Sequence, residues 1–284
     1  MFTLKVENKK NEILELTQNE CDFQVVSVTG LNPVNAQINR SAIAGLDGTK
    51  YNSSKLEERN IVITLKLNGD VEANRTRLYG YFNTKQWCKV YYKNSNRDVY
   101  AEGYIETCEA NLFSDSEIMQ ISIICPNPYF KALEEIVDDI SKVIAMFKFP
   151  FLIEDPIPFS EIDLSKITNV QNNSEIETGV IIEVEFLKNI NKLLIRNTDT
   201  GQTMTFNYAF KENDFLIIDT NKGSKSLKLI RNAKEINVFS ALTKNSKFIQ
   251  LQVGDNYFSY LADNGENDDG VLIRFKHYTL YGGV

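Results

Sequence analysis

Apolar side chains alternate with polar ones in short runs along most of this chain, and a period of two is typical of half-buried β-strands. The clearest run has Ile61, Ile63, Leu65 and Leu67 at every second position. Such a run buries one face against a core and leaves the other face to solvent. We therefore predict a mainly β protein built from antiparallel sheets.

The first half has this pattern with one interruption of helical period. Asn68-Gly69 ends a strand, and Asp70 can cap a helix in which Val71, Leu78 and Phe82 share one face. We expect an N-terminal β-sandwich or barrel-like domain over residues 1–130, with this helix packed on it. The expected strands are residues 2–6, 12–16, 23–28, 61–67, 87–92, 99–106 and 117–125.

Residues 30–54 have little apolar periodicity and several turn-forming residues. A structureless stretch of this length inside a domain is usually functional or disordered. We predict an irregular arm that becomes ordered against a partner. Its apolar and turn residues are the candidate subunit-interface residues: Pro33, Ile38, Ile43, Leu46, Asp47, Gly48 and Tyr51.

Residues 131–165 are the predicted connection between two domains. Apolar residues from Leu133 to Ile144 follow the spacing of a helix over 131–147, and prolines follow at 150, 156 and 158. We expect a connection that is part helix and part extended, proline-containing chain.

The second half has an almost pure strand pattern with a turn about every dozen residues. This spacing predicts an antiparallel β-sandwich or jelly roll over residues 166–284. The expected strands are residues 180–186, 192–196, 203–208, 214–219, 226–230, 235–242, 248–253, 257–261 and 271–278.

The charge balance limits the possible partners. The chain has 31 basic and 38 acidic residues, a net charge of −7. A nucleic-acid binder or a protein that adheres to anionic membranes would carry a basic surface, so we predict neither partner and no membrane insertion. No signal-peptide pattern or apolar run long enough to span a membrane occurs.

The four cysteines have no paired spacing, which favours reduced, buried thiols in a protein made in a cytosol.

Residues that could support catalysis are sparse. His277 is the single histidine, which excludes a two-histidine zinc site. Glu183 and Glu185 share a strand face but fit a solvated outer face. The acidic segment 263–270 departs from EF-hand spacing and fits a hairpin tip, with calcium binding as the alternative. No phosphate-binding, dinucleotide or hydrolase motif occurs, so we predict no catalytic site, cofactor or metal.

One segment resembles a known family. Ile121-Ser122-Ile123-Ile124 followed by Cys125, Pro126, Asn127, Pro128, Tyr129 and Phe130 is similar to the strand and C-P-x-P-y-f run of phage distal tail proteins. Earlier and later stretches resemble the same family in order: Gly30-Leu31-Asn32-Pro33, Asp47-Gly48, Arg59-Asn60-Ile61, Phe149-Pro150-Phe151 and Leu251-Gln252-Val253-Gly254-Asp255-Asn256.

The resemblance implies a structural protein of the virion tail or of a phage-like particle, assembled in the bacterial cytoplasm. It implies a hexameric ring of N-terminal domains on the tail tube protein. A galectin-like C-terminal domain would hold a baseplate hub, a tail-associated or receptor-binding protein, or a saccharide. Cys125, Pro126, Pro128, Tyr129 and Phe130 would be structural. Contractile tails, non-contractile tails and bacteriocins fit equally.

Two other functions remain open from the residues. A carbohydrate-binding adhesion module could act through the C-terminal sandwich, with Tyr257, Phe258 or Tyr260 stacking on sugar faces. Alternation predicts that at least half of these rings lie in the core. A polysaccharide-cleaving enzyme would use Glu183 and Glu185 as its carboxylate pair.

Overall fold

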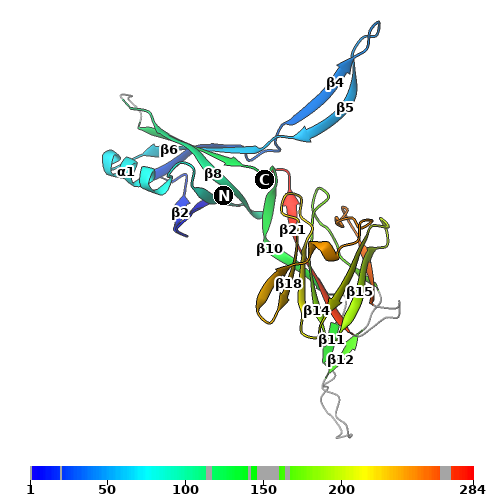
Figure 1. Cartoon of the computed structure of the whole chain (residues 1–284). Helices are drawn as coiled ribbons and strands as arrows, with labels where there is room; N and C mark the ends of the chain where they lie inside the picture. Colours follow the sequence, from blue (N-terminus) through cyan, green and yellow to red (C-terminus); the bar gives the residue numbers. More distant parts are fainter. Residues whose placement is uncertain are drawn as a thin grey trace. The chain divides into compact units, whose positions relative to one another are not determined.

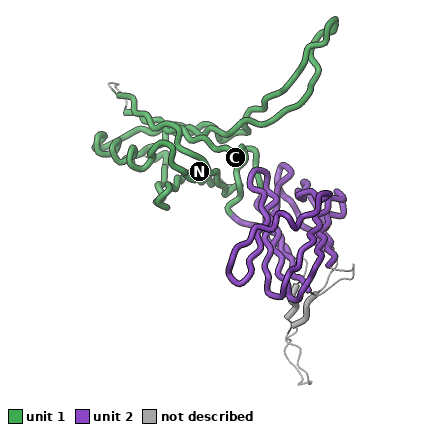
Figure 2. The backbone as a smooth tube through the Cα atoms, viewed as in Figure 1, with its two compact units in different colours: residues 1–133, 280–284 green, residues 134–279 purple. Residues whose placement is uncertain are grey.

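The structure is a computed structural model in which two compact units are distinct (Figure 2). Unit 1 comprises residues 1–133 and 280–284, and unit 2 comprises residues 134–279. The chain enters unit 2 within strand β10 (Phe130–Asp139) and leaves it near the end of β21 (Val271–Tyr281). The residues described are 2–19, 21–112, 117–139, 142–145, 160–163, 167–262 and 270–284.

Unit 1 is built on one antiparallel sheet with the strand order β3-β6-β9-β8-β7-β1-β2. Its two end strands approach each other, because Val25 donates its backbone amide to the Thr17 carbonyl at 2.7 Å. The sheet therefore curls toward a barrel, as predicted. The strands are β1 (Thr3–Asn8), β2 (Ile13–Leu16), β3 (Phe23–Thr29), β6 (Arg59–Leu67), β7 (Trp87–Lys93), β8 (Asp98–Ala110) and β9 (Ile118–Cys125).

The inner face of this sheet holds the core of unit 1. Ile61, Ile63 and Leu65 of β6 are fully buried, as their alternation predicts. The predicted helix is present as α1 (Val71–Tyr81), and the Asp70 carboxylate accepts the Ala73 amide at 3.1 Å. Leu78 and Phe82 close the core from the helix side. The expected N-terminal domain with one packed helix is thus confirmed.

The prediction of an irregular arm over residues 30–54 is wrong. The segment forms an antiparallel hairpin of β4 (Ala36–Ala42) and β5 (Thr49–Leu56), which projects from unit 1 (Figure 1). A register shift between Asn39 and Arg40 interrupts the pairing. This bulge breaks the period of two in β5, and the small residues Ala36 and Ala42 weaken the apolar signal in β4.

Unit 2 is an antiparallel sandwich, as predicted. One sheet has the order β19-β18-β17-β14-β21 and the other β13-β20-β15-β16. Phenylalanine rings stack across the two layers, with Phe186 over Phe210 at 4.2 Å and Phe258 against Phe275 at 4.5 Å between centroids. The strands are β13 (Ile167–Asn169), β14 (Ile181–Phe186), β15 (Ile190–Asn197), β16 (Thr203–Phe210), β17 (Phe215–Asp219), β18 (Ser226–Arg231), β19 (Lys234–Asn237) and β20 (Tyr257–Ala262).

The helix expected over 131–147 is also wrong where it is described. Residues 130–139 form β10, and Lys142–Ala145 form β11, which pairs with β12 (Ser160–Asp163). Leu133 and Val137 would share the buried face of a helix, yet both are exposed. The β-branched residues in this stretch favour a strand. The prolines at 150, 156 and 158 lie outside the described residues.

Two expected strands of unit 2 differ in detail. Residues 235–242 divide into β19 and a 3-10 helix, η1 (Phe239–Ala241). Residues 248–253 are extended but make only isolated bridges, such as Thr178 to Leu251. The side-chain amide of Gln250 there donates to the Thr220 carbonyl at 2.7 Å, so side-chain hydrogen bonds replace part of a strand ladder.

Candidate functional site: the hairpin, its root and the neighbouring pocket

The hairpin of residues 36–56 is the most exposed part of unit 1. Every residue from Asn35 to Glu58 is exposed, so the hairpin contributes nothing to the core. Two antiparallel strands alone are marginally stable in water. A hairpin of this kind therefore depends on its attachment at one end and on whatever covers its faces.

The two faces of the hairpin differ in chemistry. Register places Ile38 and Arg40 of β4 on the same face as Tyr51 and Leu56 of β5, whereas the opposite face is polar. Ile38 and Tyr51 each leave 60% of their surface exposed. The polar face includes Gln37, Asn39, Ser41, Lys50, Ser53 and Lys55. The hairpin thus has an apolar face that its own chain leaves uncovered.

The tip of the hairpin holds four of the predicted interface residues. Ile43 and Leu46 are exposed, and the Leu46 amide donates to the Ile43 carbonyl at 3.2 Å. Gly48 has φ +89°, a backbone conformation that residues with a side chain rarely adopt, and Asp47 precedes it. The structure therefore places Ile38, Ile43, Leu46, Asp47, Gly48 and Tyr51 together on this hairpin.

Arg59 anchors the root of the hairpin. Its side chain is fully buried and donates to backbone carbonyls of Pro128 (2.6 and 2.9 Å), Asn32 (2.9 Å), Gly30 and Gly282 (2.6 Å). Gly30 and Asn32 precede the first leg of the hairpin, Arg59 itself follows the second leg, and Pro128 belongs to the family motif. Burial lowers the pKa of the Arg59 guanidinium, against a smaller raising effect of Cys125. The guanidinium stays charged and neutralises the carbonyl dipoles around it.

The family-motif residues form the surroundings of Arg59. Cys125 pairs with Arg59 in the β6–β9 register, and the Arg59 guanidinium lies 4.1 Å above the Phe130 ring. The Pro128 carbonyl accepts two of its hydrogen bonds. Pro126 and Tyr129 line the neighbouring pocket instead. From the sequence alone, no role was assigned to Arg59. It lies on the same face of β6 as the buried residues Ile61, Ile63, Leu65 and Leu67, and this position was the available signal.

The segment 280–284 also binds at this root. The Val284 amide donates to the Leu31 carbonyl at 3.0 Å, and Arg97 lies 4.3 Å over the Tyr281 ring while donating to the Gly283 carbonyl. Gly283 lies so close to Pro33 that an added Cβ would be 2.7 Å from the Pro33 Cδ atom. Pro33 is therefore a root residue, separate from the other interface candidates.

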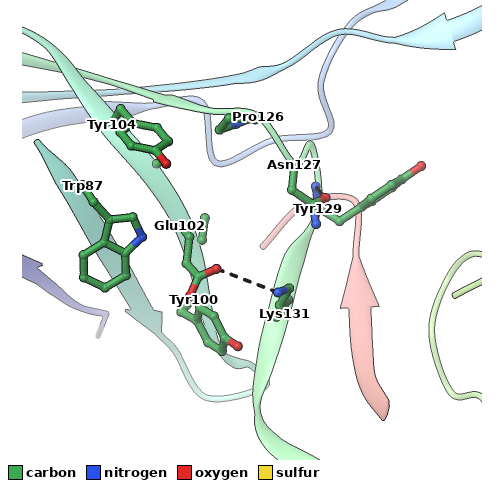
Figure 3. A pocket seen from close by; sticks show the side chains of 10 residues that line it. Trp87, Tyr100, Glu102, Tyr104, Pro126, Asn127, Tyr129 and Lys131 are labelled. Carbon is green, nitrogen blue, oxygen red and sulfur yellow. Dashed lines mark hydrogen bonds and ion pairs between the residues drawn. The ribbon is translucent and has the colours of Figure 1, made fainter. Parts of the chain in front are cut away.

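A shallow pocket lies on the outer face of the unit 1 sheet (Figure 3). Trp87 and Tyr104 face each other across β7 and β8, and Glu102 lies 3.9 Å from the Lys131 ammonium. The cavity volume is about 230 Å³. Small-molecule pockets measure roughly 300–1,000 Å³, so this one fits a side chain better than a free ligand. The lining residues are Trp87, Tyr100, Ala101, Glu102, Gly103, Tyr104, Pro126, Asn127, Tyr129 and Lys131.

The residues that we weighed for catalysis are dispersed. His277 is buried in β21, and burial lowers its pKa despite the opposing, smaller effect of its interaction with the Tyr278 backbone. Glu183 forms an ion pair with Lys276 at 2.6 Å, while Glu185 is exposed. Among the described residues no group of three or more His, Cys, Asp or Glu could hold a metal. The acidic segment 263–269 lies outside those residues.

The aromatic residues considered for sugar binding divide as alternation predicts. Phe258 and Tyr260 are buried in the sandwich core, and Tyr257 is exposed. Two of the three rings are therefore unavailable to a saccharide. All four cysteines are free, but the expectation of buried thiols is wrong for Cys21, which lies exposed in the turn between β2 and β3. No helix in the described part of the chain is long and apolar enough to span a membrane.

Comparison with known proteins agrees with this architecture. The family model of the siphovirus-type tail component, C-terminal domain, matches residues 173–277, and that of the phage tail protein RIFT-related domain matches residues 14–117. No curated protein matches the chain. The two β units match one of these domain models each, and the two matches together define a siphovirus-type phage tail component. The chain belongs to the phage distal tail protein family.

Solved structures share the fold at low sequence identity. The SPP1 Dit protein, described as a paradigm of the hub adsorption apparatus in phages infecting Gram-positive bacteria, matches with TM-score 0.69 and 15% identity, over 98% of this chain and 99% of that chain. Chains of the activated phage p2 baseplate, with Ca and with Sr, match with TM-scores of 0.52 and 0.54. Their identities are 12% and 13%, over 98% of both chains in each comparison.

Proposed function

We propose that this protein is a non-enzymatic structural component of a phage or phage-like tail tip. Six copies close into a ring through their N-terminal units. The ring joins the tail tube protein to baseplate, tail-associated or receptor-binding proteins. It forms in the bacterial cytoplasm as part of tail assembly. The uncovered apolar face of the hairpin is the observation that supports this function best.

The hairpin suits contact with a second copy for two reasons. Its apolar face with Ile38 and Tyr51 gains free energy only when another surface covers it. Its root is fixed by Arg59, so the hairpin is held at one end while it projects into solvent. Contact between a projecting element and a different surface of the next copy is heterologous, and it closes into a ring when the rotation per copy is suitable.

The C-terminal sandwich is the part proposed to hold the outer partner. It has its own core, including Val184, Phe206 and Phe275, so it can keep its fold whether or not a partner is bound. The partner is a baseplate or receptor-binding protein, with a saccharide as the alternative. Binding of glycan arrays by the full-length protein would favour the alternative. Co-purification with tail proteins would favour the main assignment.

The ring is tested by replacing residues 36–56 with a short Gly-Ser linker. We expect wild-type protein to form closed rings by negative-stain microscopy, with a mass near six copies by light scattering. The linker variant should remain monomeric, and its thermal unfolding should still show the cooperative transition of a folded protein. Wild-type protein that stays monomeric at all concentrations, also with tail tube protein, would contradict the function. Rings of the linker variant would contradict the role of the hairpin.

A further inference from the structure

The outer face of the unit 1 sheet has an uncovered apolar patch centred on Tyr104. Tyr104 leaves 51% of its surface exposed, and its register partners are Trp87 on β7 and Ile124 on β9. Glu102 and Glu106 flank it on β8 and are exposed. We call these five residues the platform. Trp87 and Ile124 are half-buried. Tryptophan and tyrosine that remain partly accessible are residue types enriched at protein interfaces.

The two carboxylates of the platform have different surroundings. Glu102 lies 3.9 Å from the Lys131 ammonium. Glu106 accepts a hydrogen bond from the Ser122 hydroxyl at 2.8 Å and forms no ion pair with any described residue. Within the described ranges, Glu106 is therefore the carboxylate of the platform without a cation.

The hairpin carries the complementary charge. Residues 36–56 contain Arg40, Lys50 and Lys55 against Asp47, a net charge of +2 in a chain of net charge −7. None of the three cations forms an ion pair within the described part of the chain. Arg40 is the cation on the apolar face, two residues from Ile38. Lys50 and Lys55 lie on the polar face.

Spacing supports a direct match between the two surfaces. On the hairpin an apolar residue and a cation, Ile38 and Arg40, are two residues apart on one strand face. On the platform an aromatic residue and an anion, Tyr104 and Glu106, are also two residues apart. Residues two apart on a regular strand are roughly 6.6–6.8 Å apart. Glu106 lies at a bulge between Ile105 and Thr107, where its hydrogen bond with Ser122 holds its carboxylate, and the long Arg40 side chain can accommodate the altered spacing. Ile38 over Tyr104 therefore brings Arg40 within reach of Glu106.

We propose that the platform receives the apolar face of the hairpin from a second copy of this chain, with Arg40 paired to Glu106. The proposal rests on the proposed ring and names its receiving surface. Ile38 and Tyr51 of one copy cover Trp87 and Tyr104 of the next. The pair between Arg40 and Glu106 fixes the register, because a misplaced hairpin would desolvate both charges without pairing them. The pocket beside Tyr104 accepts a side chain of the incoming hairpin.

Charge reversal tests this pairing in the full-length protein. Arg40→Glu and Glu106→Arg should each weaken ring formation at least tenfold, measured as the protein concentration at which half the mass is assembled. The double variant should recover most of the wild-type assembly, because the two charges that meet at each interface are then exchanged and again opposite in sign. Both residues are exposed, and the Ser122 hydroxyl that loses Glu106 can donate to the Asn60 side chain at 3.0 Å instead. Thermal unfolding of the single variants should therefore stay close to that of the wild type.

Two matched controls locate the contact. Lys50→Glu makes a charge change of the same size on the polar face of the hairpin and should alter assembly less than threefold. Glu102→Arg, on the other side of Tyr104, should fail to rescue Arg40→Glu. Rings that form normally in Arg40→Glu would overturn the platform and leave the proposed function standing. Rescue by Glu102→Arg instead of Glu106→Arg would overturn the assigned pair. A wild-type protein that forms no rings would contradict both the proposed function and the proposed platform contact.

Discussion

The hairpin and strand β6 are neighbours in the sequence and both are antiparallel β-structure, yet they are stabilised differently. In β6 alternate residues from Arg59 to Leu67 are buried against the core of unit 1. In β4 and β5 every residue is exposed. Strand β6 forms ladders with both β3 and β9, whereas β4 and β5 pair only with each other. The two regions therefore differ in their number of ladders and in what covers their side chains.

This difference shows which interactions stabilise each element against unfolding. Burial of an apolar side chain contributes about 1.5–3 kcal/mol, whereas a ladder hydrogen bond contributes about 1 kcal/mol net. Strand β6 has both contributions within one chain. The hairpin has only the ladder and its root until another copy covers it. Substitutions should therefore separate an internally stabilised region from an assembly-dependent one.

The largest expected effect is at Arg59, where the two regions meet. Arg59→Met should lower the free energy of unfolding of unit 1 by about 3 kcal/mol or more, since several buried carbonyls lose their donor. Urea unfolding measures this. Arg59→Lys keeps the charge but loses the planar arrangement of donors, so it should lie between Met and wild type. A neutral effect of Arg59→Met would show that the root is held by other contacts.

The next expected effect compares one substitution at two sites. Ile63→Ala in β6 should lower the free energy of unfolding by about 3 kcal/mol, because Ile63 is fully buried. Ile38→Ala in β4 should change it by no more than about 0.5 kcal/mol but should impair ring assembly. Chemical unfolding and light scattering on the same samples give both values. Equal losses of stability would mean that β4, like β6, is stabilised by burial within its own chain.

A smaller effect concerns a buried titratable group of unit 2. Burial lowers the pKa of His277 below its usual 6.5, so the unfolded chain binds the proton more readily than the folded one. Stability is complete above pH 6.5 and falls as the pH decreases toward the folded pKa. The slope for one proton is at most about 1.4 kcal/mol per pH unit. The interaction of the imidazole with the Tyr278 backbone raises the pKa and so opposes the fall in part.

Urea unfolding at pH 7.5 and pH 5.5 checks the effect of His277. The wild type should lose more stability over this interval than His277→Gln, since other titrating groups are common to both proteins. The same loss in both would mean that His277 has no role in the pH dependence.

The smallest effect concerns the thiols. Burial raises the pKa of Cys88 and of Cys125 to about 12, whereas Cys21 is exposed. Burial also raises the pKa of Cys108 to about 12. We expect one thiol to react quickly with a maleimide at pH 7.5 and the other three only after unfolding. Mass spectrometry of the labelled protein gives the count, and Cys21→Ser should abolish the fast reaction.

Much of the fold was predictable where local pattern and tertiary packing agree. The run Ile61 to Leu67, the cap at Asp70 and most strands of the sandwich follow from period and turn chemistry. The helix expected at 131–147 failed because strand pairing overrides an apolar spacing that also fits a helix. The hairpin was missed because a bulge interrupts its alternation.

The candidate site was predictable only in part. The residues Ile38, Leu46 and Tyr51 could be chosen from sequence because they are apolar in a segment without a core pattern. The role of Arg59 depends on carbonyls that are distant in sequence, such as that of Gly282, and no local pattern reports them. The platform likewise joins β7, β8 and β9, so its residues become neighbours only in the folded sheet.

Hydrogen–deuterium exchange of the hairpin before and after assembly tests the central claim most directly. In the monomer the amides of residues 36–56 should exchange quickly, while those of β6 are protected, because opening an uncovered hairpin is easy. In the assembled ring the hairpin amides should slow by at least tenfold, and those of β6 should change little. Rings in which residues 36–56 exchange as fast as in the monomer would contradict the claim that the hairpin is covered by a neighbouring copy.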